Sequence, residues 1–289
     1  PKLRIEAVDN DENQLSTAIS EGNIDAFGEL NSLCPKADLI VIALPPIATA
    51  SILPQIAELC SPQSVVTDVA SVKASVTTAV NKLDPEFVAR FVPGHPIAGS
   101  EKSGYLASTD NLFNQRNIIL TPQLDTEPRA VALVHEMWRT LGADILGMST
   151  KRHDEVLAAT SHLPHLLAFA IVNALVRQEQ SEDIFRYAAG GFADFSRLAS
   201  SDAQMWADVF VANFDAASSV LDDYIDDLMA LRQAVKNQDH AALYASFSQA
   251  RLVRNNFIAK YFNPMNQPTI QTNNVISFTV EPGGQVIGD

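Results

Sequence analysis

Three short segments of this chain hold side chains that suit proton transfer on an acidic substrate. They are Gly94-His95-Pro96-Ile97-Ala98-Gly99 with Glu101 just beyond, Ser161-His162-Leu163-Pro164-His165, and Gly190-Gly191-Phe192 running to Arg197. A neutral imidazole can take a proton from an alcohol near neutral pH, and a guanidinium fork can hold a carboxylate through two hydrogen bonds. The three segments together indicate a base and an anion clamp, although no one of them decides the function alone.

The elements that must position these residues follow two patterns. In the first half, strands are predicted over 4–8, 37–44, 64–68, 87–92 and 117–120, with helices between them that begin with 12–21. This rhythm favours a doubly wound α/β domain with a parallel sheet. His95 then follows a strand directly, at the carboxyl edge of the sheet, where such folds bind ligands.

From about residue 150, apolar residues recur at helical spacing, so the second half is predicted to be mostly helical. After residue 261 the composition changes to that of a linker, and 275–280 is predicted to form a strand. We therefore expect a first domain over 1–149, a helical domain over 150–262, and a tail over 263–289. The tail is either disordered or the start of a further domain.

Composition excludes several classes of protein. Acidic residues outnumber basic ones by 34 to 20, which gives a net charge of -14 and argues against a nucleic-acid surface. Cys34 and Cys60 lie far apart and lack a nearby histidine, so we predict two buried thiols with no disulfide or metal. No apolar run approaches the ~20 residues of a membrane span, and no leader is visible at Pro1. We expect a cytoplasmic protein without membrane insertion.

The three segments resemble those of the prephenate and arogenate (cyclohexadienyl) dehydrogenases, the hydride-transferring enzymes of tyrosine biosynthesis. The similarity runs from about Asp9 to Tyr261. It implies a Rossmann-type dinucleotide-binding domain followed by an all-α substrate and dimerisation domain. The implied reaction is the NAD-dependent oxidative decarboxylation of prephenate to 4-hydroxyphenylpyruvate, with arogenate, which would give tyrosine, as a second candidate substrate. A homodimer is also implied.

The resemblance assigns a role to each candidate residue. It makes His95 the base for the substrate hydroxyl, and Ser71 a bridge between that hydroxyl and the base. His165 and Arg197 would bind the substrate, and Glu101 would gate the pocket. On sequence alone, Ser71 could instead cap the helix that follows it, and Glu101 could be an exposed loop residue.

Alternative interpretations remain open for three further residues. Because Ser161–His165 is predicted to start a helix, the helix dipole would favour the neutral form of its imidazoles. His162 could be a packed core residue. Arg197 could form an intrahelical ion pair with Asp194. Trp206 could line the pocket or belong to the core.

The cofactor site is only partly represented. A dinucleotide fold uses a Gly-x-Gly-x-x-Gly turn after its first strand, and no such motif occurs in this chain. By resemblance, Asp9 would accept hydrogen bonds from the adenosine ribose and so favour NAD, and Leu44 and Pro45 would line the nucleotide pocket. Asp9 could instead form a turn with Asn10 and Asp11. We expect the missing first strand, glycine loop and helix, about 30 residues, to lie upstream in the natural protein.

Two other functions are compatible with parts of the sequence. Residues 278–284 resemble the first strand of enolpyruvylshikimate-phosphate synthase, so a fused synthase domain is expected. The chain could then be a non-catalytic dimerising or regulatory module tethered to that domain, although His95, His165 and Arg197 argue against this. A β-hydroxyacid dehydrogenase would need a helix-borne lysine, and no lysine occurs between Arg152 and Asn173.

Overall fold

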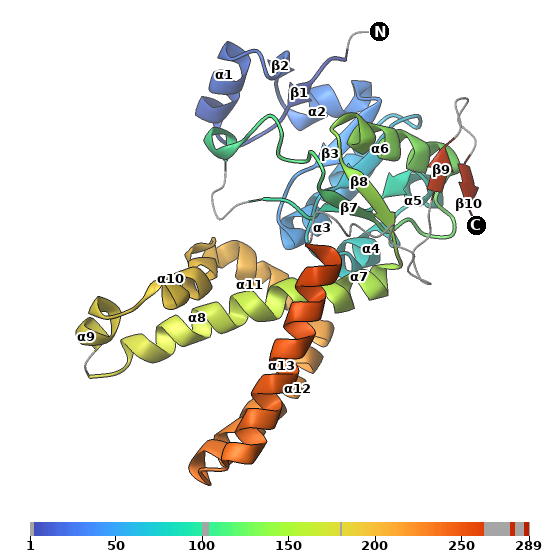
Figure 1. Ribbon diagram of the computed structural model, residues 1–289. Helices are drawn as coiled ribbons and strands as arrows, with labels where there is room; N and C mark the ends of the chain where they lie inside the picture. Colours follow the sequence, from blue (N-terminus) through green and yellow to red (C-terminus); the bar gives the residue numbers. More distant parts are fainter. Residues whose placement is uncertain (1–2, 100–103, 180, 263–277, 281–285, 289) are drawn as a thin grey trace. The chain divides into compact units, whose positions relative to one another are not determined.

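The computed structural model describes residues 3–99, 104–179, 181–262, 278–280 and 286–288 (Figure 1). The chain divides into two compact units, one formed by residues 1–214 with 276–289 and the other by residues 215–275. All the candidate site residues that the structure describes belong to the first unit. The predicted domain boundaries at 149/150 and 262/263 stay a prediction.

Parallel strand pairs dominate the first unit. β1 (Glu6–Ala7) pairs with β2 (Ala26–Phe27), and β3 (Leu39–Ile42), β4 (Val65–Asp68) and β5 (Phe91–Val92) form a second sheet. A third sheet consists of β6 (Gly94–Pro96), β7 (Asn117–Leu120) and β8 (Asp144–Gly147). β9 (Phe278–Val280) pairs antiparallel with β10 (Val286–Gly288). Residues 281–285 lie outside the described residues, and the resemblance of 278–284 to a synthase stays a prediction.

The strand order agrees with the expected Rossmann-type fold. Such a sheet has the order 3-2-1-4-5-6, so a chain without the first strand keeps strands 3-2 apart from strands 4-5-6. Here β2-β1 and β3-β4-β5 are separate sheets in the described structure. β4 is buried throughout, whereas Val41 on β3 is 43% exposed. β3 is therefore an edge strand here, despite its apolar composition.

Two strand predictions were wrong. Residues 85–89 form the helix α5 (Pro85–Ala89), and only Phe91–Val92 of the expected strand 87–92 is extended. The reason is local, because the Asp84 side chain accepts a hydrogen bond from the Glu86 N–H and so caps a helix that has proline at its first position. In addition, β6 runs antiparallel to β7, so the sheet is not parallel throughout, and His95 lies within a short strand rather than in a loop.

Helices account for most of the remaining structure. In the first unit they are α1 (Glu12–Ser20), α2 (Leu30–Leu33), α3 (Pro46–Leu59), α4 (Ala74–Val80), α5, α6 (Pro128–Thr140), α7 (Thr150–Leu157), α8 (Leu163–Val176), α9 (Ser181–Arg186), α10 (Gly190–Ser196) and α11 (Ala203–Ala212). Short 3₁₀ segments are η1 (Cys34–Lys36), η2 (Tyr105–Ala107) and η4 (Arg197–Ser200), and η3 (Ala158–His162) is π-helical. The predicted change to helical structure at about residue 150 is thus confirmed.

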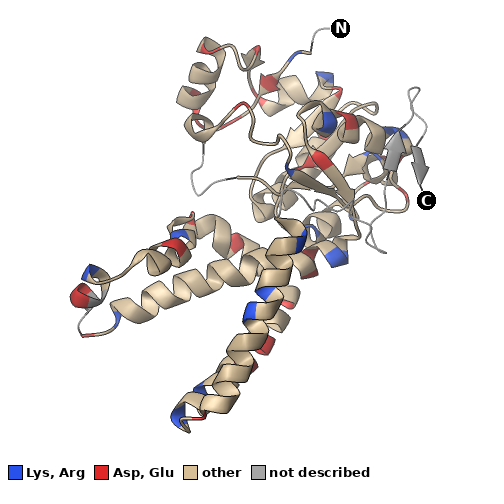
Figure 2. Ribbon diagram, in the orientation of Figure 1, with Lys and Arg blue, Asp and Glu red and all other residues tan. Residues whose placement is uncertain are grey.

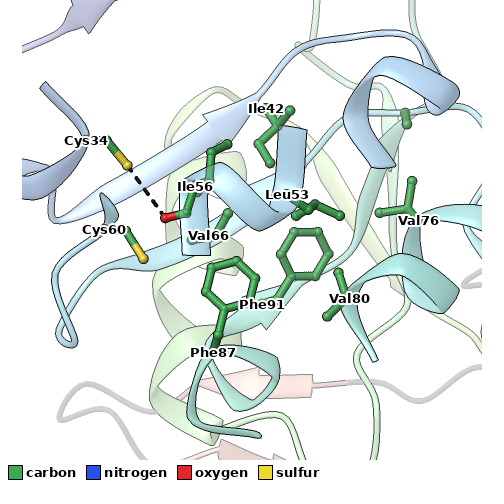
Figure 3. Packing of buried hydrophobic residues seen from close by; sticks show 11 residues of the cluster. Cys34, Ile42, Leu53, Ile56, Cys60, Val66, Val76, Val80, Phe87 and Phe91 are labelled. Atoms are coloured by element: carbon green, nitrogen blue, oxygen red, sulfur yellow. Dashed lines mark hydrogen bonds between the residues drawn. The ribbon is translucent and has the colours of Figure 1, made fainter. Parts of the chain in front are cut away.

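The core of the first unit lies on both faces of the β3-β4-β5 sheet. On one face, Val66 packs with Leu53, Phe87 and Phe91 (Figure 3). On the other face, the neighbouring Val65 packs with a cluster that includes Trp138 of α6. Successive residues of a strand point to opposite faces, so β4 contributes to both clusters. Three layers, with helices above and below a sheet, therefore hold the carboxyl ends of the strands in place.

Cys34 and Cys60 both belong to this core, as predicted. Both thiols are free and buried, and Cys34 Sγ lies 3.9 Å from the carbonyl oxygen of Ile56 (Figure 3). Burial raises the pKa of the Cys34 thiol to about 11. They act as small apolar side chains.

One helical segment is apolar over a greater length than the sequence analysis expects. The helix Thr150–Val176 is long and apolar enough to cross a membrane by length and composition alone, and only 22% of its most apolar window is buried. α8 carries no Lys, Arg, Asp or Glu, and Figure 2 shows it without charged residues between its ends. Such a helix is also found in soluble proteins, where its apolar surface is covered by other protein.

The second unit is a helical hairpin of α12 (Phe214–Lys236) and α13 (His240–Tyr261). Gln238 has φ 56° in the turn, and the Asp239 carboxylate caps α13 by accepting a hydrogen bond from the Ala242 N–H at 2.9 Å. Many large apolar side chains remain exposed on this hairpin, among them Leu228, Met229, Tyr244 and Phe247. A hairpin of two helices leaves much apolar surface uncovered.

Candidate active site

His95 is held by a short strand and by a second histidine. It lies on β6, opposite Ile119 of β7. Its Nδ1 is 2.8 Å from Nε2 of His153, which belongs to α7. The two rings meet edge to face, with centroids 5.1 Å apart. The structure therefore brings together two imidazoles that are 58 residues apart in the sequence.

The backbone just before His95 is fixed by a buried ion pair. Lys73 and Asp68 are completely buried and in direct contact. The Lys73 ammonium also donates a hydrogen bond to the carbonyl oxygen of Gly94 at 2.6 Å, and the Gly94 N–H donates to Asp68 Oδ1 at 3.3 Å. A Cβ at Gly94 would lie 3.0 Å from the Asp68 carbonyl oxygen, so glycine permits this close approach.

Asp154 connects His153 to the start of α4. Its Oδ1 lies 2.7 Å from His153 Nδ1 and accepts the Lys73 N–H at 2.9 Å, while its Oδ2 accepts the Ala74 N–H at 2.7 Å. These N–H groups lie at the N-terminus of α4, where backbone donors have no partner within the helix. The capping residue of α4 is Lys73 and the capping side chain is that of Asp154, so the interpretation of Ser71 as the helix cap was wrong. Ser71 itself is half-buried in the loop between β4 and α4.

The charge distribution around these histidines favours their neutral forms. Burial lowers the pKa of His95 well below 6.5, and the neighbouring His153, Lys73 and His162 lower it further. Burial also lowers the pKa of His153, although the hydrogen bond and charge of Asp154 act in the opposite direction. At neutral pH, His95 is an uncharged imidazole, as a general base must be.

His162 and His165 lie inside a continuous helical segment, not at its start. α7, the π-helical η3 and α8 follow each other without a break from Thr150 to Val176. The predicted helix start at Ser161 was therefore wrong, and so was the dipole argument drawn from it. Burial is the main cause that lowers the pKa of both side chains, that of His162 to about 4. π-helical turns are rare and often mark functional sites.

Asn213 and Trp206 link these two histidines to the His153 helix. The Asn213 amide donates a hydrogen bond to the Asp154 carbonyl oxygen at 3.0 Å and lies 3.2 Å from His162 Nδ1. Trp206 stacks on His165, with centroids 3.7 Å apart and 21° between the planes, and meets the edge of His162. Trp206 is also buried against Val72 and Val209, so it belongs to the core and contacts the site at once.

Arg197 and Glu101 complete the candidate substrate residues. Arg197 is exposed and begins η4, which packs against α8, the helix that carries His165. Arg197 and His165 therefore lie on elements that contact each other. Glu101 lies outside the described residues.

The candidate cofactor residues follow two strands of the first unit. Asp9 is exposed beyond the end of β1, and its Oδ1 accepts the Asp11 N–H at 2.8 Å, as the turn interpretation predicts. Leu44 and Pro45 lie between β3 and the start of α3, and both are exposed. They lie at the carboxyl ends of parallel strands, where a doubly wound sheet binds nucleotides.

Sequence reasoning missed the residues that support the base. The residues to which no role was assigned from the sequence are Asp68, Lys73, His153, Asp154 and Asn213. Asp68 and Lys73 lie in the same segment as Ser71, and a lysine and an aspartate in a segment otherwise predicted to be buried were a usable signal. His153 and Asp154 look like ordinary residues of a helix start, and their role follows only from tertiary contacts.

Comparisons with known proteins agree with this arrangement. Residues 1–146 match the family model described as prephenate dehydrogenase, nucleotide-binding domain, and residues 149–249 match that described as prephenate dehydrogenase, dimerization domain. The chain belongs to the prephenate dehydrogenase family.

Individual relatives cover most of the chain. The chain is 35% identical to the cyclohexadienyl dehydrogenase of Zymomonas mobilis over 221 residues, which are 76% of this chain and 75% of that protein. It is 32% identical to the prephenate dehydrogenase of Bacillus subtilis over 257 residues, which are 87% and 68% of the two chains. Both figures place this chain firmly within the family.

Solved structures of family members have the same fold. The crystal structure of prephenate dehydrogenase from Aquifex aeolicus in complex with hydroxyphenyl propionate and NAD+ superposes with a TM-score of 0.81 at 31% identity, covering 89% of this chain and 90% of that one. Arogenate dehydrogenase from Synechocystis gives 0.73 at 26% identity, covering 88% and 91%. The expected Rossmann-type domain followed by a helical domain is thus confirmed.

Proposed function

We propose that this chain is an NAD-dependent dehydrogenase that decarboxylates prephenate to 4-hydroxyphenylpyruvate, and that arogenate, giving tyrosine, is a second substrate. The observation that carries this proposal is the placement of His95, a neutral imidazole on β6 whose Nδ1 contacts His153. Family membership supplies the reaction, and the local geometry supplies the base. The alternative of a non-catalytic module has no use for this buried set of polar side chains.

The chemistry requires little more than alignment and a base. The ring hydroxyl of prephenate loses its proton while the carbinol carbon is oxidised and the ring carboxylate leaves as CO₂, and the aromatic ring that forms makes the reaction strongly downhill. We assign the proton to His95. Ser71, in the loop after β4, is proposed to orient the same hydroxyl. NAD, when bound, supplies the two-electron acceptor.

The residues present fit part of this cofactor. Asp9 uses one carboxylate oxygen for the Asp11 N–H, and the exposed carboxylate is suited to accept hydrogen bonds from ribose hydroxyls. Leu44 and Pro45 are exposed at the carboxyl end of β3 and would form an apolar wall. The pyrophosphate normally needs a glycine-rich turn, which this chain does not contain. The described residues thus suit a ribose and an apolar part of the dinucleotide but not its pyrophosphate.

Substrate binding is assigned to the helical half of the first unit. His165 is half-buried, and it donates from Nδ1 to the Ser161 carbonyl oxygen at 2.9 Å, which leaves Nε2 to accept a hydrogen bond from a substrate hydroxyl. Arg197 offers the fork that holds a carboxylate bidentately. Glu101 is proposed as a gate of the substrate pocket, as the family resemblance implies. In a protein of net charge -14, such a local positive group is what an acidic substrate requires.

A direct assay tests the function. The natural full-length protein is mixed with NAD and either prephenate or arogenate, and the absorbance of the reduced nicotinamide is followed. We expect turnover with prephenate, and His95→Asn should lower kcat by about 10²- to 10⁴-fold because the general base is lost. The exposed His240→Gln is the matched control and should behave as the wild type. No turnover with either substrate would leave the tethered module as the better proposal.

We further propose a homodimer in the cytoplasm. The matched dimerization domain covers residues 149–249. The exposed apolar side chains of α8 and of the α12–α13 hairpin support an interface there, because a second copy of the chain would cover them.

A further inference from the structure

We infer that Asp154 and His153 act as positioning residues that fix the tautomer of His95, so that its proton lies on Nδ1 and its Nε2 is the bare nitrogen that receives the substrate proton. This inference rests on the proposed function and goes beyond it, since it names the residues that make His95 a base. The hydrogen bonds run from the Asp154 carboxylate through His153 to His95.

The carboxylate of Asp154 sets the direction of the hydrogen bonds that lead to His95. It accepts two backbone N–H groups, from Lys73 and Ala74, at 2.9 and 2.7 Å. A carboxylate offers only acceptors, so its 2.7 Å contact with His153 Nδ1 requires the proton on that nitrogen. Since α4 donates to Asp154 from fixed backbone positions, the carboxylate cannot rotate away without leaving helix donors unpaired.

The proton on His153 Nδ1 then decides the state of His95. A neutral imidazole carries one proton, so His153 Nε2 is an acceptor. The contact of 2.8 Å to His95 Nδ1 is a hydrogen bond only if His95 donates it. A neutral His95 that donates from Nδ1 has its lone pair on Nε2. The opposite arrangement would place two acceptors, or an extra buried positive charge, against each other.

The surrounding charges agree with single protons on both rings. Lys73 and Asp68 face the pair from the loop after β4 and from β4, and Asp154 and His162 face it from the helical segment. Burial lowers the pKa of both His95 and His153, and Lys73 acts in the same direction. A doubly protonated ring is therefore disfavoured until the substrate hydroxyl delivers its proton.

The same series of hydrogen bonds stabilises the product of the proton transfer. When the substrate O–H bond breaks, the proton binds His95 Nε2 and makes His95 an imidazolium. Its Nδ1–H still donates to His153, whose own Nδ1–H donates to the Asp154 carboxylate. The positive charge thus faces a polarised chain that ends in a negative one, which offsets part of the cost of forming a cation in a buried place.

Nuclear magnetic resonance of the imidazole nitrogens tests the tautomer directly. The full-length natural protein, labelled with ¹⁵N in its histidines, six of which lie in this sequence, gives long-range ¹H–¹⁵N correlations that distinguish the Nδ1–H from the Nε2–H form. His95→Asn assigns the signal of His95. We expect the Nδ1–H form for His95 and for His153. An Nε2–H form of His95 in the wild type overturns the inference, whatever the activity.

Asp154→Asn provides the kinetic test. The amide keeps its oxygen for the Ala74 N–H but places its NH₂ where Oδ1 faced both His153 Nδ1 and the Lys73 N–H. It therefore donates to His153 Nδ1, which reverses both tautomers and places a proton on His95 Nε2. We expect kcat to fall about 10²- to 10⁴-fold with the KM for prephenate changed less than about threefold. Asp84→Asn, which alters the cap of α5 and touches no histidine, is the matched control.

The outcomes separate the two proposals. A folded Asp154→Asn protein with wild-type kcat, or with the Nδ1–H form of His95 retained, overturns the inference. If Asp154→Asn does not fold, the tautomer measured in the wild type still decides. A wild type with the Nδ1–H form but without turnover of prephenate or arogenate overturns the proposed function and leaves the tautomer assignment standing.

Discussion

At the scale of single residues, the histidines of the candidate site share one direction of pKa shift. Burial lowers the pKa of His95, His153, His162 and His165, and each lies in the first unit. A buried neutral imidazole suits a base that must accept a proton rather than carry one at rest. The same burial makes the folded state sensitive to acid.

His162 gives the clearest prediction of that sensitivity. Its pKa is about 4 in the folded state and near 6.5 in the unfolded chain, so between these values the unfolded chain binds the proton first. The free energy of unfolding therefore falls as the pH drops from 6.5 to 4, by up to about 1.4 kcal/mol per pH unit for this group alone. Below pH 4 both states are protonated and this loss is complete.

Urea unfolding between pH 7 and 4 measures this effect. His162→Gln should reduce the slope of unfolding free energy against pH, whatever it does to the absolute value. The exposed His240→Gln should leave the slope unchanged. Equal slopes for wild type and His162→Gln would show that His162 is not buried as a neutral ring.

At the scale of elements, polar groups join β4, β6 and α4 in addition to the apolar packing of Val66 against Val76 and Val80. The Lys73–Asp68 pair holds Gly94 of β6, and Asp154 of α7 holds the start of α4. These contacts fix the strand that carries His95 against the helix that carries His153. Buried ion pairs of this kind stabilise little overall, but the loss of one partner leaves an unpaired charge.

Lys73→Met should accordingly destabilise the protein by about 3–5 kcal/mol, because Asp68 would be left charged and buried. Asp68→Asn combined with Lys73→Met should cost less than Lys73→Met alone, since the amide needs no counterion. Chemical denaturation of the two variants and the wild type decides the point. A double variant that is less stable than Lys73→Met would contradict the assigned role of the ion pair.

Sequence reasoning identified the elements better than their boundaries. The α/β pattern, the strand over residues 117–120 and the onset of helices at 150 followed from apolar periodicity, which depends on neighbouring residues. The helix at 85–89 was missed because its signal was the cap at Asp84 and the proline after it, not its apolar pattern. The antiparallel β6 was missed because three residues carry too little periodicity to indicate a strand.

The site was predictable only where a residue belongs to a recognisable segment. His95, His165, Arg197 and Ser71 lie in such segments, and their proposed roles still await experiment. His153 and Asp154 acquire their importance from contacts with residues 58 and about 80 positions away. Tertiary contacts at that separation leave no local pattern in one sequence.

At the scale of the whole molecule, the exposed apolar surface of α12 and α13 indicates a binding partner. α13 has no buried residue in the described structure, and α12 has only Ala217. Exposed side chains of this size on a helical hairpin are costly in water and are usually covered in the assembled protein. The hairpin is therefore expected to lie in the dimer interface.

Light scattering coupled to size exclusion tests this expectation. The wild type should elute with twice the mass of the chain, and Phe247→Glu should shift the equilibrium toward monomer because a charge would be buried in the interface. Gln249→Glu adds the same charge two residues along α13 and is the matched control. A monomeric wild type, or a Phe247→Glu protein that stays dimeric, would exclude this face from the interface.

The stacking of Trp206 on His165 has a practical consequence. The chain has two tryptophans, and the other one, Trp138 of α6, belongs to a core cluster that contains no histidine. An indole stacked at 3.7 Å on an imidazole reports through its fluorescence on the charge and position of that ring. The protein thus contains an intrinsic optical probe beside the proposed substrate residue, and emission can follow occupancy of the site in a stopped-flow instrument without any added dye.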